Sequence, residues 1–363
     1  MRRRLNIAFF GSSLVSAYWN GAATYYRGII RALHDEGHQI TFYEPDAYER
    51  QRHRDIPDPP WARIVVYSGT SEAAVYRALE ESRGADLIVK ASGVGVFDDL
   101  LEREVLQSRR AGALVVFWDV DAPATLDRVL RNPDDPFRAL IPGYDLILTY
   151  GGGAPVVKAY AALGARACIP VYNALDPSSH YPVAPEPRFA TDLGFLGNRM
   201  PDRRERVEEF FFHAAIGAPE CRFMLAGNGW DSHPLPANIT YLGHVYTYDH
   251  NAFNCSPRAI LNINRSSMAR YGFSPPTRIF EAAGAGACLI TDAWEGIEGF
   301  LKPEREVIVV HDGDELVQRL RTLTPTRARS IGAAARSRLL AEHTYQHRAE
   351  QLAALLSSWF GSR

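Results

Sequence analysis

The feature that most constrains the fold is a regular alternation between short apolar runs and longer amphipathic segments. In the first half of the chain, apolar runs long enough for one buried strand fall at residues 5–10, 38–43, 63–67, 86–90, 113–118, 145–149 and 167–171. Helical patterns fill the intervals at residues 21–37, 72–83, 98–110 and 154–163. This alternation predicts a parallel sheet with helices on both faces, whose ligands bind outside the carboxyl ends of the strands.

The alternation stops at a proline-dotted stretch and then resumes. Asp176-Pro177 and Tyr181-Pro182 lie in this stretch, whose composition is typical of a linker between domains. Apolar runs return at residues 192–196, 222–225, 239–242, 259–263, 288–291 and 307–310. Because 363 residues suffice for two ordinary cores, we expect two α/β domains over residues 1–172 and 192–342, joined by a linker over residues 173–191.

Composition excludes several classes of protein. A hydrophobic content of 46%, a charged content of 23% and a net charge of -2 favour a soluble globular protein over a nucleic-acid or membrane-surface binder. The first apolar run ends at Gly11-Ser12-Ser13, so we interpret it as a strand and not as a signal peptide. No segment has the length of a membrane span. The four cysteines form no C-x-x-C pair, which favours buried thiols in a reducing, cytoplasmic setting.

Residues 271–298 carry the densest set of candidate binding groups. Ser274-Pro275-Pro276 precede a short helix over residues 277–283, which small residues end before a buried strand. The start of such a helix suits a diphosphate, and Thr277 and Arg278 add donors there. Glu281, one turn on, is placed to accept hydrogen bonds from a ribose diol. The alternative is that Arg278 and Glu281 merely pair on a surface.

The string S-P-P-T-R-I-F-E-A-A-G-A-G-A, followed by T-D and G-I-E, resembles the donor-site motif of GT-B glycosyltransferases. The resemblance is closest to the CgeB-like (spore maturation protein-like) group. It implies two Rossmann-like α/β domains facing across a cleft, with Glu281 on the ribose of a nucleotide sugar and Thr277 and Arg278 near its phosphates. Many retaining members carry a Glu eight residues before the ribose Glu. Phe273 stands there in this chain, so the sugar contact of that carboxylate does not carry over.

Other strand-to-glycine turns of the second half are further donor-site candidates. The resemblance implies that the turn after residues 192–196 lines the donor phosphates, with Gly197 and Arg199 first and Arg203 second. Cations at a helix start are unfavourable without an anion, although a solvated face is the alternative. The resemblance also places turns at the base, where the candidates are Gly227, Asn228 and His244. A structural role is the alternative for His244.

In the first half, the loop after residues 5–10 offers Gly11, Ser12, Asn20 and Gly21 as candidate cleft-facing residues. The loop lacks G-x-G-x-x-G, which disfavours a dinucleotide-binding dehydrogenase. Its pattern resembles the first glycine-rich turn of GT-B enzymes. Simple turn chemistry is the alternative.

Two carboxylates follow the strand expected at residues 113–118. Asp119 and Asp121 spell D-x-D, which holds a metal in the other large glycosyltransferase fold, but two α/β halves match that fold poorly. The D-A-P that begins at Asp121 resembles the CgeB-like group. We therefore choose Asp121 as the base for the acceptor hydroxyl, with Asp119 second. The alternative is that either Asp caps the next helix.

The sequence thus predicts a glycosyltransferase that moves a sugar from a UDP-, GDP- or dTDP-linked donor to a hydroxyl acceptor, without a metal or other cofactor. A sugar-nucleotide epimerase or hydrolase of the same shape, and a non-catalytic nucleotide-sugar-binding protein, stay open. A phosphorylase would need a suitable cofactor lysine, and none stands out. The resemblance implies that the tail over residues 343–363 is a helix that packs on the N-terminal domain, and a homodimer helix is the alternative. No nucleic-acid polymer and no stable membrane insertion are expected.

Overall fold

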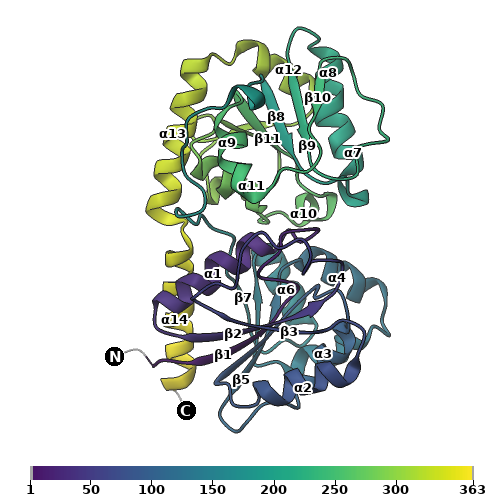
Figure 1. The fold of residues 1–363 in the computed structure, drawn as a ribbon, viewed down its shortest axis with the longest axis vertical. Coiled ribbons are helices and arrows are strands. Elements are labelled where there is room, and N and C mark those ends of the chain that lie inside the picture. The colour runs from purple at the N-terminus through teal and green to yellow at the C-terminus, as the bar shows by residue number, and fades with distance from the viewer. Residues whose placement is uncertain (1–2, 362–363) are drawn as a thin grey trace. The chain divides into compact units, whose positions relative to one another are not determined.

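The computed structural model describes residues 3–361, which divide into two compact units. The first unit runs to Asn173 and includes the C-terminal segment from Tyr345 onward. The second unit runs from Ala174 to Thr344. Each unit is built on its own sheet with helices packed against it (Figure 1).

The first unit contains a seven-stranded parallel sheet in the order β3-β2-β1-β4-β5-β6-β7. The strands are β1 (Asn6–Phe10), β2 (Gln39–Asp46), β3 (Arg63–Ser68), β4 (Leu87–Ala91), β5 (Leu114–Asp119), β6 (Leu146–Thr149) and β7 (Cys168–Pro170). Its helices are α1 (Ala23–Asp35), α2 (Glu72–Ser82), α3 (Asp98–Glu104), α4 (Ala122–Arg131), α5 (Pro136–Leu140), α6 (Gly153–Ala162) and α14 (Tyr345–Gly361). Strand order reverses between β1 and β4, which is where doubly wound sheets bind ligands.

Helix α14 packs within the first unit, beside α1 (Figure 1). The side chains of Arg348 and Gln351 donate to the backbone oxygens of Tyr172 and Pro170, at 3.2 and 3.0 Å. A Cβ on Gly28 of α1 would overlap the Tyr345 ring, so the two helices approach closely only because position 28 is glycine. The C-terminal segment is therefore a structural part of this unit.

The second unit contains a six-stranded parallel sheet in the order β10-β9-β8-β11-β12-β13. The strands are β8 (Leu193–Leu196), β9 (Phe223–Ala226), β10 (Ile239–Tyr241), β11 (Ala259–Asn262), β12 (Leu289–Asp292) and β13 (Ile308–Val310). Its helices include α7 (Arg204–Val207), a π-helical turn (Glu208–Phe212), α8 (His213–Gly217), α9 (His250–Cys255), α10 (Ser266–Tyr271), α11 (Thr277–Gly284), α12 (Gly313–Thr322) and α13 (Pro325–Glu342). Its core is dominated by the apolar strand residues and by Phe210, Phe211, Phe212 and Trp230.

Differences from the predicted elements are concentrated at their ends. Strand β2 continues to Asp46, where it pairs with β3. Glu44, which reads as a surface residue, is fully buried and receives a hydrogen bond from Ser13. The helix expected to reach residue 110 ends at Glu104 and is followed by turns. Among the described residues, no helix combines the length and the hydropathy needed to cross a membrane.

Candidate functional site

In the second unit, the candidate site lies at the start of α11, where the sequence places its densest set of binding groups. The N-cap residue is Pro276, and no side chain caps the first turn by a hydrogen bond. The N–H groups of a helix start carry a partial positive charge that favours an anion. The preceding residues Gly272 and Phe273 both have left-handed backbones, with φ of +68° and +45°. A positive φ is strained in a bulky residue such as Phe273. Strained backbone conformations of this kind are common at ligand-binding sites.

Arg278 and Glu281 do form a pair, with 3.2 Å between Nη1 and Oε2. The pair is not on an open surface, since the two side chains are 16% and 5% exposed. The Arg278 Nη1 atom is buried and makes no hydrogen bond within the described chain. The alternative of a solvated surface pair therefore does not describe these residues.

A second arginine adds positive charge at this place. Burial and the nearby charges of Arg278 and Arg265 lower the pKa of Arg203 to about 10. Mutual repulsion of this kind requires the three guanidinium groups to be close. Arg203 donates from Nη2 to the backbone oxygen of Asn198 at 2.5 Å, and its Nε atom is buried without a hydrogen bond.

The acidic groups beside the three arginines neutralise this charge only in part. Asp292 is fully buried and accepts from Arg206 and from the backbone N–H of Asn264. Asp202 accepts from Arg265 at 3.1 Å. Within residues 3–361, no ion pair joins Arg203 to a carboxylate. The start of α11 therefore carries uncompensated positive charge, which an anionic ligand would neutralise.

Two glycine turns pack together at the carboxyl ends of β8 and β9. The backbone N–H of Gly197 donates to Ala226, and the N–H of Asn228 donates to the Asn198 side chain, at 2.8 and 2.9 Å. Gly227 has φ of +118°, and a Cβ there would overlap the backbone of Gly197. Only glycine fits this close approach. The turns thus bring Gly197, Gly227 and Asn228 together.

The other predicted donor-site residues differ in their contacts and burial. The Ser274 hydroxyl is buried and donates to the backbone oxygen of Gly272 at 2.9 Å, so it holds the loop. The Arg199 guanidinium lies 6.0 Å from the centre of the Trp230 ring. His244 contacts Tyr246 edge to face. Thr277 is the half-buried first residue of α11.

Sequence reasoning missed His250, the first residue of α9. Burial lowers its pKa to about 4, while among the surrounding charges Glu281 raises the pKa and Arg278 lowers it. The Nε2 atom lies 3.2 Å from the backbone oxygen of Val245. His250 is therefore neutral near pH 7, and the charges of Arg278 and Glu281 act on it. Arg265 was also missed, although it follows β11 directly, at the edge where ligands bind.

In the first unit, the two predicted catalytic carboxylates have different environments. Asp119 is fully buried and accepts from Ser92, Thr125 and Tyr160 side chains at 2.8, 3.0 and 2.5 Å. Burial raises its pKa, but both its oxygens are occupied by donors, which is typical of a structural carboxylate. Asp121 is the half-exposed N-cap residue of α4, and its side chain does not cap the helix.

The predicted cleft loop is held mainly by its own side chains. Ser12 Oγ bonds to Asn20 Oδ1 at 2.9 Å, and Asn20 Nδ2 donates to the backbone oxygens of Ser13 and Ser16. Gly11 packs against the Phe42 ring, whereas Gly21 is exposed. Ser12 and Asn20 therefore fix the shape of this loop.

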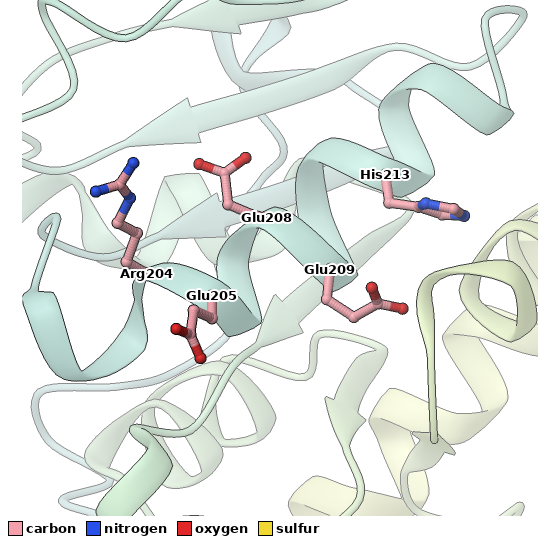
Figure 2. Close-up of a pocket in the computed structure, with 5 residues that line it drawn as sticks. All are labelled: Arg204, Glu205, Glu208, Glu209 and His213. Atoms are coloured by element: carbon pink, nitrogen blue, oxygen red, sulfur yellow. The ribbon is translucent and has the colours of Figure 1, made fainter.

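A surface hollow of about 530 Å³ lies elsewhere in the second unit (Figure 2). Its lining residues come from successive turns of one helical segment, and they are Arg204, Glu205, Glu208, Glu209 and His213. None of them is buried, and the positive and negative groups are mixed. Across residues 3–361, no cluster of three or more His, Cys, Asp or Glu side chains is arranged to hold a metal ion.

Comparisons with known proteins bear on this arrangement. Residues 203–354, less than half of the chain, match the protein family described as "Glycosyl transferase-like". No curated protein matches the sequence. Among solved structures, the sucrose-phosphate synthase of Thermosynechococcus elongatus is similar over 99% of this chain and 100% of its own, with a TM-score of 0.69 and 14% identity.

HepE of Anabaena, solved with UDP and glucose, is similar over 98% of this chain and 100% of its own, with a TM-score of 0.70 and 12% identity. The β-glucosyltransferase of phage T4 covers 98% of this chain and 99% of its own, with a TM-score of 0.59 and 11% identity. At such identities the likeness concerns the fold. The chain has the GT-B fold, with two parallel-sheet α/β domains, as the sequence predicted.

Proposed function

We propose that this protein is a glycosyltransferase that moves a sugar from a nucleoside-diphosphate sugar to a hydroxyl group. The observation that carries the proposal is the charge of Arg203, which forms no ion pair with a described carboxylate and is repelled by Arg278 at the uncapped start of α11. A diphosphate brings two to three negative charges and oxygen acceptors for both guanidinium groups. The match of residues 203–354 to a glycosyltransferase-like family covers the same segment.

The same groups that bind the donor would assist its departure. When the bond from the sugar to the diphosphate breaks, negative charge accumulates on the leaving phosphate oxygens. Arg203, Arg278 and the helix start are already in place to stabilise this charge, so little reorganisation is needed during the reaction. This electrostatic role requires no metal ion, in line with the metal-independent reaction that we propose.

Glu281 is our proposed ribose ligand. It is 4% exposed and lies beside Arg278, whose guanidinium it partly neutralises in the free protein. If a diphosphate takes over the guanidinium, Glu281 becomes available to accept hydrogen bonds from the ribose diol. The nucleotide that we favour is UDP, because HepE and a DNA α-glucosyltransferase of the same fold were solved with it.

Asp121 is our proposed general base for the acceptor hydroxyl. It is half-exposed at the carboxyl end of β5, and its side chain has no capping role. Asp119 is the poorer choice because four donors already occupy its oxygens. The D-A-P segment that begins at Asp121 is also what supports assignment to the CgeB-like group.

We also propose a cytoplasmic location. All four cysteines, Cys168, Cys221, Cys255 and Cys288, are free thiols, and burial raises the pKa of each. Unreactive thiols of this kind are typical of a reducing compartment.

A thermal-shift screen tests the proposal. Purified protein is heated with UDP, GDP, ADP, CMP or dTDP, each with and without magnesium. A ligand that binds only the folded state raises the melting temperature, and we expect a rise of a few degrees with one diphosphate, independent of magnesium. The responding nucleotide is then supplied as its sugar conjugate with candidate acceptors. No rise with any nucleotide would refute the proposal.

A further inference from the structure

Three loops of the first unit meet around the side chain of Arg50. They follow β1, β2 and β4, which are neighbours in the sheet and end at the same edge because all the strands are parallel. The guanidinium lies within 3.4 Å of the backbone oxygens of Ser12, Trp19 and Val94. Arg50 itself follows β2. Its side chain therefore joins the loops at the ligand-binding edge of three adjacent strands.

Arg50 is buried without an ion pair. It is 6% exposed, and its Nε atom makes no hydrogen bond within the described chain. Its three bonds go to neutral carbonyl oxygens at the long end of the hydrogen-bond range. No salt bridge joins it to any carboxylate in residues 3–361. Burial lowers the pKa of Arg50, and the nearby groups Tyr48, Tyr26 and Glu44 oppose this shift only in part.

The acidic side chains of these loops form hydrogen bonds or ion pairs with residues other than Arg50. Glu44 accepts from Ser13, from the backbone of Leu14 and from Gln51. Asp55 pairs with Arg27 at 3.2 Å. Asp98 pairs with Lys90 at 2.5 Å. Burying a charge without an ion pair is unfavourable for folding, and buried groups with shifted pKa values often lie at functional sites.

The backbone around Arg50 is strained in the same three loops. Four residues other than glycine have left-handed backbones there, and they are Trp19, Tyr48, Glu49 and Phe97. Such backbone conformations are strained in residues with a side chain, and clusters of them occur at ligand sites. Tyr48 and Trp19 are 54% and 49% exposed, and the Tyr48 ring lies 4.9 Å from the guanidinium. Arg50 is thus one aromatic side chain below the surface.

We propose that Arg50 binds an oxyanion, a phosphate or a carboxylate, of the sugar acceptor. The inference rests on the proposed transferase function and names the acceptor class, an anionic hydroxyl compound such as a sugar phosphate or a uronic acid. The five N–H donors of a guanidinium match two oxygens of either group. Trp19 and Tyr48 supply the exposed aromatic faces against which a sugar ring packs. Displacement of weak carbonyl contacts by a charged partner favours binding.

The test is a thermal-shift titration of the full chain with glucose 6-phosphate, glucuronate and glucose. It compares the natural protein with Arg50→Gln and with Arg52→Gln. Arg52 is the matched control, because it loses the same charge two residues away and is 80% exposed. All titrations are repeated in an Arg203→Gln background, which weakens anion binding in the second unit. Arg50→Lys keeps the positive charge but lacks the planar guanidinium group that can donate to two oxygens at once.

We expect one of the two anionic sugars to raise the melting temperature and glucose to have no effect. Arg50→Gln should weaken this binding about ten- to a hundredfold, Arg50→Lys by less, and Arg52→Gln not at all. Whichever sugar responds identifies the oxyanion as phosphate or carboxylate. Without the sugar, Arg50→Gln should melt at or above the natural temperature, because an uncompensated charge has been removed.

Equal anion binding by the Arg50→Gln and Arg52→Gln proteins would overturn the inference. So would a drop of several degrees in the melting temperature of Arg50→Gln, since the guanidinium would then be a brace for three carbonyl groups. Nucleotide binding measured in the same plates separates the two proposals. If nucleotides bind but no anionic sugar depends on Arg50, the acceptor inference fails alone. If an anionic sugar depends on Arg50 but no nucleotide binds, the transferase proposal fails and the oxyanion site stands.

Discussion

The ligand-binding edges of the two sheets differ in how their buried charges are neutralised. In the first unit, Lys90 is fully buried between Asp98 and Glu102, and Asp119 is surrounded by hydrogen-bond donors. In the second unit, Arg203 lacks a carboxylate among the described residues and is repelled by Arg278. A neutralised buried charge indicates a structural role, whereas an uncompensated one indicates a binding site. By this criterion Arg50 belongs with the second group, although it lies in the first unit.

The largest expected effect is the difference in unfolding free energy between the Lys90 and Arg203 substitutions. Lys90→Met should lower the free energy of unfolding by about 3–5 kcal/mol, because Asp98 and Glu102 are left without their cation. Arg203→Met should change it by less than about 1 kcal/mol or raise it, since no carboxylate depends on it. Urea denaturation followed by circular dichroism measures both. Equal losses would remove the distinction on which the comparison rests.

The next pair contrasts two carboxylates that lie two positions apart. Asp121→Asn should lower turnover by about 10²–10⁴-fold, the usual contribution of a general base, with a melting temperature close to the natural value. Asp119→Ala should lower the free energy of unfolding by about 2–4 kcal/mol, because Ser92, Thr125 and Tyr160 lose their common acceptor. Full turnover by Asp121→Asn would remove it as the base.

A smaller effect is expected from pH. The pKa of His250 is lowered to about 4 in the folded protein, below the value near 6.5 of an unfolded histidine. The unfolded chain therefore binds the proton first, and stability that is present above pH 6.5 is lost as the pH falls toward 4. We expect a loss of about 1–3 kcal/mol from this residue. The difference in unfolding free energy between the natural protein and His250→Gln should shrink over that interval, and a constant difference would contradict the assignment.

The smallest effect concerns a glycine turn in each unit. Gly227→Ala should weaken nucleotide binding by about 1–2 kcal/mol, because φ is +118° and the added Cβ meets the backbone of Gly197. Gly21→Ala should leave binding unchanged, since no atom lies within 4 Å of its added Cβ. Calorimetric titration with the nucleotide from the screen compares the two. Unchanged binding by Gly227→Ala would show that this turn does not shape the site.

The sequence was informative where local pattern determines structure. Apolar runs bounded by glycine located the strands to within a few residues, because such runs have few alternatives to burial in a parallel sheet. The chain order of those runs also indicated which polar residues stand at the carboxyl edge. Arg278 and Glu281 were identified from the helix expected at residues 277–283 and from the resemblance to GT-B enzymes, and Arg203 from that resemblance. In the structure Arg278 pairs with Glu281 and its charge lowers the pKa of Arg203.

Burial of charge could not be predicted from local pattern. Arg50 lies in a charged, proline-containing segment that is typical of a surface loop, yet the loops after β1 and β4 cover it. The burial of Glu44 and Lys90 could not be predicted either, because it depends on contacts with residues that are not their neighbours in the sequence. The opposite roles of Asp119 and Asp121 also depended on a distant residue, Tyr160.

The central claim is that Arg203 and Arg278 bind a diphosphate at the start of α11. Calorimetric titration of UDP into the natural protein, Arg203→Gln and Arg204→Gln tests it most directly. Arg204 is an exposed neighbour in the surface hollow and serves as the matched control. We predict a dissociation constant at least about tenfold higher for Arg203→Gln, as expected for a lost charge-assisted hydrogen bond, and an unchanged one for Arg204→Gln. Equal constants for all three proteins would contradict the account.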